Sequence, residues 1–166
     1  MSTKNFLIGL VCLVVIGSVA GYFATKSGPD QNNDTRTVKL YYYNPDLDKD
    51  AGGNVQCSSA GLVAVERSLP VSQTPIQDTV KLLLAGELTE EEKSRGVTTE
   101  FPLDSLTLKG ANLVEGQLTL EFSDLKNTTS GGACRAGILW HQIEATATQF
   151  AEVDSVSFMP VELFQP

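Results

Sequence analysis

The sequence predicts an α+β fold, a two-layer sandwich in which two main helices lie on one face of a mostly antiparallel sheet. Five segments have the alternating apolar pattern of half-buried strands, and two longer segments have one apolar stripe at helical spacing. Their order along the chain is strand, strand, helix, strand, strand, helix, strand (β-β-α-β-β-α-β). Because each helix has a single apolar face, both are expected to cover the same side of the sheet.

Ahead of this domain, the sequence predicts a membrane-spanning helix at Phe6–Ala24. The stretch contains no charged residue, and a helix of its length covers roughly 28 Å, close to the hydrocarbon thickness of a bilayer. Lys4 favours a cytoplasmic N-terminus, which places the remainder on the extracytoplasmic side of the cell membrane. A signal peptide cleaved at residues 18–20 is the alternative, and the protein would then be secreted. The chain therefore divides into an anchor or signal segment, a flexible linker poor in apolar residues, and a folded domain, at residues 1–26, 27–36 and 37–166.

The domain is expected to open with two strands, at residues 37–43 and 61–68. In the first strand, apolar residues at every second position alternate with a second face that carries Tyr41 and Tyr43. Amphipathic aromatic side chains on an exposed sheet face commonly anchor protein interfaces, so Tyr41 and Tyr43 are candidate partner-binding residues. The alternative is that both tyrosines pack under the polar segment that follows them.

The first main helix is expected to begin after Thr74, where a capping residue, a proline at the first helical position and Gln77 coincide. Gly86 is placed to end it. Thr89 and Glu92 repeat the capping-box pattern, which predicts one or two further helical turns that close near Gly96.

The second half of the domain repeats the sequence of strands and helix. Residues 105–109 and 117–122 are expected to be short strands joined by a connection at residues 110–116. Apolar residues at helical spacing predict the last helix over residues 133–150, and a final strand is expected at about residues 154–160.

Cys57 and Cys134 lie in the part of the chain that is expected to leave the cytoplasm. An oxidising compartment permits them to form a disulfide. A bond that closes about 77 residues would stabilise the fold by on the order of 4 kcal/mol in the chain-entropy model. Two buried free thiols are the alternative.

Residues that could carry chemistry are scattered rather than patterned. His141 is the only histidine, and no second ligand stands at a metal-binding spacing from it. Asp46, Asp48 and Asp50 alternate as in a calcium loop, but the distal glutamate of such a loop is missing, so a solvated acidic loop is expected. Gly131–Gly132, ahead of the last helix, offers backbone N–H groups to an anion, although a loop between a strand and a helix needs such glycines in any case. No catalytic set, metal site or cofactor is therefore expected.

The charge of the chain bears on its partners. It has 20 Asp and Glu residues against 12 Lys and Arg, a net charge of −8. An acidic surface repels phosphate backbones, so nucleic acid is not expected as a partner.

Several segments resemble the central signature of the GerMN domain, the module named from the spore germination and sporulation protein GerM. They are residues 74–86, 89–93 and 101–102, and the resemblance extends to residues 38–42, 118–123, 142–143 and 148–150. The resemblance implies a bacterial extracytoplasmic protein, anchored by a lipid or a hydrophobic segment, that acts as a structural or docking part and not as an enzyme. It also implies a relation to sporulation or germination, and it brings no catalytic residues. This chain has room for one copy of the domain, where GerM has two.

We therefore predict a membrane-anchored envelope protein that docks to other envelope proteins or to copies of itself. The alternative is a cell-wall or small-ligand binding module that uses the Gly131–Gly132 turn and the Asp46–Asp50 loop as contact points.

Overall fold

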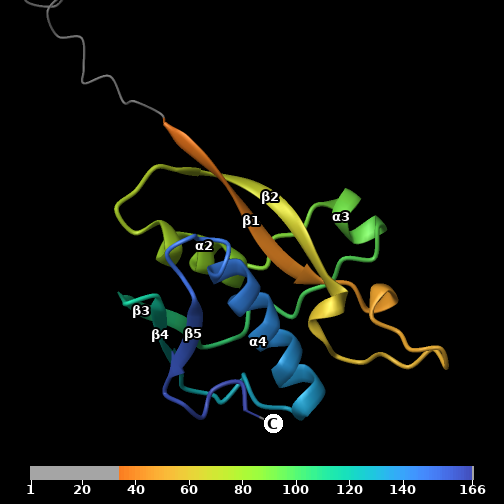
Figure 1. Cartoon of the computed structure of the whole chain (residues 1–166). Coiled ribbons are helices and arrows are strands. Elements are labelled where there is room, and N and C mark those ends of the chain that lie inside the picture. Colours follow the sequence, from red (N-terminus) through yellow and green to blue (C-terminus); the bar gives the residue numbers. More distant parts are fainter. Residues whose placement is uncertain (1–33, 166) are drawn as a thin grey trace, which may run out of the picture. The chain divides into compact units, whose positions relative to one another are not determined.

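The structure, a computed structural model, describes residues 34–165 and has the predicted α+β class (Figure 1). The predicted membrane helix at Phe6–Ala24 lies outside the described residues, as does most of the predicted linker. Across residues 34–165, no helix has the length and apolar character needed to cross a bilayer. The first strand begins at Thr35, two residues inside the segment predicted as linker.

The strands form two sheets, which corrects the prediction of a single mostly antiparallel one. In the first sheet, β1 (Thr35–Tyr43) pairs antiparallel with β2 (Leu62–Pro70). In the second, β4 (Gln117–Asp124) pairs antiparallel with β3 (Leu106–Val114) and parallel with β5 (Ser155–Met159). Strand spacing and alternation in the sequence do not reveal which strands pair, and the parallel neighbour of β4 follows it only after a long helix.

The helices begin and end close to the predicted positions. Helix α2 spans Pro75–Leu84, α3 spans Glu90–Ser94 and α4 spans Ala133–Ala147, shorter by three residues than predicted. Both hydrogen bonds of the capping box between Thr89 and Glu92 are present at the start of α3. Gly86 follows α2 with φ +67°, and a Cβ there would collide with the carbonyl of Phe101, so this position requires glycine.

The segment predicted as a connection at residues 110–116 is mostly strand. Strand β3 continues through a bulge at Leu108–Gly110 and then pairs with β4 up to Val114. Only Glu115 and Gly116 form the turn, with φ of +49° and +80°, as expected for a two-residue hairpin turn of the primed type. Gly110 suggested the end of a strand in the sequence, whereas it marks the bulge.

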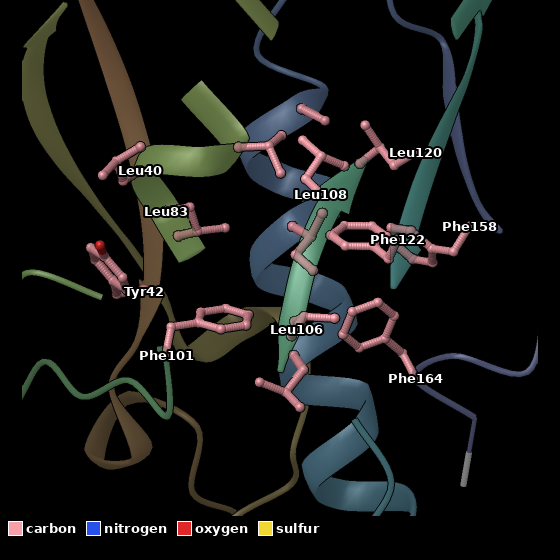
Figure 2. Close-up of a cluster of buried hydrophobic side chains, with 14 of the residues drawn as sticks. Leu40, Tyr42, Leu83, Phe101, Leu106, Leu108, Leu120, Phe122, Phe158 and Phe164 are labelled. Carbon is pink, nitrogen blue, oxygen red and sulfur yellow. The ribbon is translucent and has the colours of Figure 1, made fainter. Parts of the chain in front are cut away.

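One hydrophobic core connects the two sheets through the helices (Figure 2). Leu40 and Tyr42 of β1 face the α2 residue Leu83, while Leu120 and Phe158 come from the second sheet. The rings of Phe158 and Trp140 of α4 meet edge to face, with centroids 4.5 Å apart. Burial of each large apolar side chain contributes about 1.5–3 kcal/mol relative to exposure, so this shared core is the main stabilising feature.

Candidate functional site

The two candidate tyrosines have different surroundings. Tyr41 is half-buried on the outer face of the first sheet, directly across from Ala64 of β2. Tyr43 is only 4% exposed, and its hydroxyl donates a hydrogen bond to the Asp48 carboxylate. The ring also packs so closely on Gly61 that a Cβ there would collide with it. The expectation of an exposed Tyr41 and Tyr43 pair is therefore wrong for Tyr43, because the loop after β1 folds over it.

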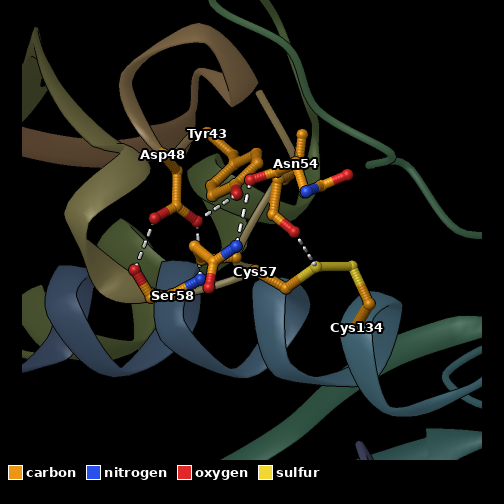
Figure 3. Close-up of a disulfide and its surroundings, with 8 residues drawn as sticks. Tyr43, Asp48, Asn54, Cys57, Ser58 and Cys134 are labelled. Atoms are coloured by element: carbon orange, nitrogen blue, oxygen red, sulfur yellow. Dashed lines mark hydrogen bonds between the residues drawn. A yellow bond between two sulfur atoms is a disulfide. The ribbon is translucent and has the colours of Figure 1, made fainter. Parts of the chain in front are cut away.

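That loop, residues 44–61, is held in place by Asp48 (Figure 3). The Asp48 carboxylate accepts hydrogen bonds from the backbone N–H of Ser58 at 2.6 Å and from the Ser58 hydroxyl at 2.5 Å, in addition to the bond from Tyr43. The hydrogen bonds from Ser58 and Tyr43 lower the pKa of the Asp48 carboxyl, and burial, followed by its bond to Asp48, raises the pKa of the Tyr43 hydroxyl. Both groups thus keep their roles as acceptor and donor over a wide pH range.

The other two aspartates of the loop have separate partners. Asp46 lies 2.6 Å from the ammonium of Lys49. Asp50 accepts from the backbone N–H groups of Gly52 and Asn54, each at 2.8 Å, and so shapes the turn. Within residues 34–165, no group of three or more His, Cys, Asp or Glu side chains is arranged to hold a metal ion. The alternation of the three aspartates thus reflects the internal bonding of the loop.

A disulfide joins Cys57 to Cys134, the second residue of α4, with their Cα atoms 5.1 Å apart (Figure 3). Cys57 has φ +58°, a left-handed conformation that is uncommon for a residue with a side chain. The disulfide and Asp48 therefore attach the same loop to two different places, the start of α4 and the end of β1.

His141 lies in α4 with about a third of its side chain exposed, and its Nδ1 atom is 3.8 Å from a carboxylate oxygen of Glu144. This nitrogen is buried and makes no hydrogen bond within the described residues. A hydrogen-bonded nucleophile, base and orienting group, as a hydrolytic triad requires, is not found around it in residues 34–165.

The Gly131–Gly132 turn leads into α4, as predicted, with φ of +136° and +95°. The guanidinium of Arg135 bends back beside it and donates to the carbonyl oxygens of Thr128, at 2.8 Å, and Ser130. Its Nε donates to Glu100. The cation nearest the turn is thus bonded to neighbouring oxygens.

Other parts of the chain cover the edge of β1 that faces away from β2. Gln149 accepts from the Lys39 N–H at 2.8 Å and donates to the Lys39 carbonyl at 2.7 Å, so its amide imitates a neighbouring strand. The Thr146 hydroxyl accepts from the Tyr41 N–H at 3.0 Å. Tyr43 and Thr98 exchange both backbone hydrogen bonds, at 3.2 and 2.7 Å. This covering keeps β1 separate from the second sheet.

Comparison with known proteins decides the family. The model of the family described as "Germane: Sporulation and spore germination" matches residues 39–162. The chain belongs to the Germane family. The GerMN resemblance found in the sequence is thereby confirmed, and the family is one related to sporulation and spore germination. A search of curated proteins finds no match.

Two solved structures of the GerM protein from Bacillus subtilis are similar to this Germane domain. The structure of its tandem GerMN domains has 19% sequence identity and a TM-score of 0.49 and covers 80% of this chain, which spans 41% of that one. The structure of its first GerMN domain has 20% identity and a TM-score of 0.47, and the match covers 73% of this chain and 80% of the other.

The outer face of the β1 and β2 sheet in this Germane domain is exposed, and it includes Tyr41, one of the candidate partner-binding residues. Its side chains are exposed or, at Tyr41, half-buried, and the pairs across the two strands are Thr37 with Ser68, Lys39 with Glu66, and Tyr41 with Ala64. The face combines one aromatic ring with polar and charged groups, a composition that suits contact with another protein.

Sequence reasoning missed two sets of residues in this Germane domain. The sequence pattern does not indicate that Gln149 and Thr146 cover the edge of β1. Thr146 lies on the apolar stripe of α4, and the structure buries it there, where its hydroxyl needs a hydrogen-bond partner. The pattern places Arg67 in a strand but does not predict its ion pair with Glu92.

Proposed function

We propose that this Germane-family chain is a membrane-tethered, extracytoplasmic and non-catalytic docking component of an envelope assembly related to sporulation or germination. The single observation that carries the docking role is the outer face of the β1 and β2 sheet. The half-buried ring of Tyr41 lies beside the small side chain of Ala64, among charged and polar neighbours, and no other element of residues 34–165 covers this face.

The surroundings of the other polar groups support a docking role over an enzymatic one. Asp48 and Asp50 accept hydrogen bonds from their own loop, Arg135 is bonded to carbonyl oxygens and Glu100, and His141 has only a distant carboxylate beside it. The bonds of the two aspartates and of Arg135 stabilise the fold. Catalysis by the usual side chains requires a nucleophile or base within hydrogen-bond reach of a reacting group, whereas Asp48, Asp50 and Arg135 are bonded to internal partners.

The membrane tether is proposed from the sequence. The stretch Phe6–Ala24 has no charged residue and is long enough for a bilayer. Only a short polar segment, residues 25–34, separates it from β1. Such a tether would hold the sheet close to the outer surface of the membrane, where the partners are expected to be envelope proteins or further copies of the chain.

The test compares two substitutions in the full-length protein in its membrane. Tyr41→Ala removes the half-buried aromatic ring from the outer face, and Val114→Ala, the control, removes an exposed apolar side chain from the β3 and β4 hairpin. The proposal expects Tyr41→Ala to reduce the crosslinked complex at least about fivefold, the effect of losing roughly 1 kcal/mol of contact, while Val114→Ala leaves it unchanged. Equal recovery with both variants, at unchanged melting temperatures, would contradict the proposal.

A further inference from the structure

The hydrogen bonds made by β1 show which residues of β2 direct their backbone groups away from β1. Lys39, Tyr41 and Tyr43 direct their backbone groups away from β2, toward Gln149, Thr146 and Thr98. In an antiparallel ladder, alternate residues point to opposite edges, so the residues between them bond to β2. The flanking bonds from Asn44 N–H to Gly61 and from Val71 N–H to Asp34 follow the same alternation.

The β2 residues that point outward are therefore Ala64, Glu66 and Ser68. Their N–H groups make no hydrogen bond within residues 34–165, and all three side chains are exposed. Among their carbonyl oxygens, that of Glu66 accepts from the Arg67 guanidinium at 2.9 Å. Backbone donors and acceptors repeated at every second residue along an extended strand are the groups with which another strand pairs.

The other strand edges in the described part of the chain are less suitable for pairing with an added strand. The edge of β1 is covered, β3 is interrupted by its bulge at Leu108–Gly110, and β5 has only five residues. Strand β2 has nine residues and a continuous register with β1 from end to end. Its outward N–H groups are unpaired, and of its outward carbonyl oxygens that of Glu66 is already bonded to Arg67, so it is the longest regular edge in residues 34–165 whose donors are free.

We propose that the β2 edge binds an extended segment of a partner protein as a third strand, with a Lys or Arg residue of that segment beside Glu66. This inference rests on the proposed docking function and specifies its partner. Glu66 stands in the middle of the edge, and although Lys39 lies directly across from it, the two form no ion pair. A cationic side chain on the added strand would complement this carboxylate.

The same residue argues against a second copy as the occupant. Two β2 edges that pair antiparallel about their midpoints bring their Glu66 carboxylates together, and like charges across a strand pair are destabilising. A partner strand also gains an apolar contact, because the small Ala64 side chain leaves room beside it for a residue that reaches the Tyr41 ring. The same partner segment would then bind to both the β2 edge and the outer face of the sheet.

The first test maps the contact in the full-length protein in its membrane. The photoreactive residue p-benzoylphenylalanine is placed at Ala64 or Ser68, four residues apart on the edge, and at Val114 as a control on the other sheet. The proposal expects both edge positions to crosslink to one segment of one partner, at residues about four apart and flanking a Lys or Arg, because paired strands advance together. Crosslinks to separate elements of the partner, or to β2 of a second copy, would overturn it.

The second test uses proline. Ala64→Pro and Ser68→Pro each remove an outward N–H that the fold does not use, and proline is accepted on strand edges for that reason. The proposal expects these variants to keep the melting temperature within a few degrees and to lose partner binding about fivefold or more, with Ser68→Ala as the matched control that retains the N–H. Glu66→Lys, which leaves the backbone unchanged, is expected to weaken binding more than Glu66→Gln.

The outcomes separate this inference from the proposed function. If Tyr41→Ala weakens binding while the proline and Glu66 variants bind normally, the outer face binds the partner and the edge does not, so the inference is wrong. If none of these variants changes binding, both the inference and the proposed function are wrong.

Discussion

The guanidinium of Arg67 donates one hydrogen bond to each carboxylate oxygen of Glu92, at 2.7 and 2.8 Å. Glu92 also closes the capping box of α3 by accepting from the Thr89 N–H, and Arg67 reaches the Glu87 carbonyl at 2.9 Å. One ion pair, with only 8% of the Glu92 side chain exposed, therefore fixes the short helix α3 against the sheet that carries the proposed docking surface.

Replacing Glu92 with Gln should destabilise the fold strongly. The substitution leaves the mostly buried Arg67 without its counter-charge and replaces one of its two acceptor oxygens with an NH2 group, while the remaining amide oxygen can still accept from the Thr89 N–H. The free energy of unfolding is therefore expected to fall by about 3 kcal/mol, the low end for a broken buried pair. Denaturant unfolding measures it. Glu91→Gln, at the exposed neighbouring position, is the control, and equal effects of the two changes would show that the ion pair has no special role.

The same pair predicts a loss of stability in acid. The hydrogen bonds from Arg67 lower the pKa of Glu92 from an ordinary value of 4.5 to about 2. Because the folded state binds this proton more weakly than the unfolded state, the stabilisation is complete above about pH 4.5 and is lost as the pH falls toward 2. Unfolding measured between these pH values should show a shallower slope in Glu92→Gln than in the unchanged protein, and identical slopes would contradict the assignment.

Gln149 and Thr146 should protect different backbone amides of β1 from hydrogen exchange. Gln149→Ala is expected to accelerate hydrogen exchange at Lys39 and to cost about 2–4 kcal/mol for three lost hydrogen bonds, two to Lys39 and one to the Thr146 carbonyl. Thr146→Val should instead accelerate exchange at Tyr41. Gln149→Glu keeps the acceptor for the Lys39 N–H and should preserve its protection. Exchange followed by NMR distinguishes these residues, and uniform acceleration in every variant would mean that the two side chains do not act locally.

The disulfide should form in the mature protein and stabilise it. Closing a loop of 77 residues contributes about 2–4 kcal/mol, so Cys57→Ser is expected to lower the melting temperature as much as reduction of the unchanged protein does. Alkylation of the unreduced full-length chain should label only Cys12. Labelling of all three cysteines in the folded protein would show that the bond does not form where the protein works.

The segment Phe6–Ala24 should keep the protein in the membrane. We expect the full-length chain to resist extraction at alkaline pH and the folded domain to be digested by protease added outside the cell membrane. A chain that starts at Ser27 should be released from the membrane. Recovery of a shortened chain, lacking about the first 20 residues, in the soluble fraction would instead favour cleavage of a signal peptide.

Local signals in the sequence predicted local structure well. The proline after Thr74, the capping box at Thr89 and the glycine at position 86 mark helix ends through bonds or conformations within a few residues, and the structure has α2 and α3 at these positions. Thr74 itself makes no capping bond, because its hydroxyl donates to Asp78 instead.

Features that depend on distant residues could not be predicted in the same way. Pairing of β4 with β5 and the covering of β1 by Gln149, 110 residues from Lys39, arise only in the folded chain. Tyr43 and Tyr41 have the same place in the strand pattern, yet the loop that bonds through Asp48 buries only Tyr43. Periodicity assigns a residue to a face of a strand, but it does not show what covers that face.

Crosslinking of the full-length protein in living cells, followed by mass spectrometry of what is attached to the outer face near Tyr41, tests the docking function most directly. The proposal predicts envelope proteins or further copies of the chain, attached through the β1 and β2 sheet and reduced by Tyr41→Ala. Recovery of glycan fragments alone, or of no partner at this face, would contradict it.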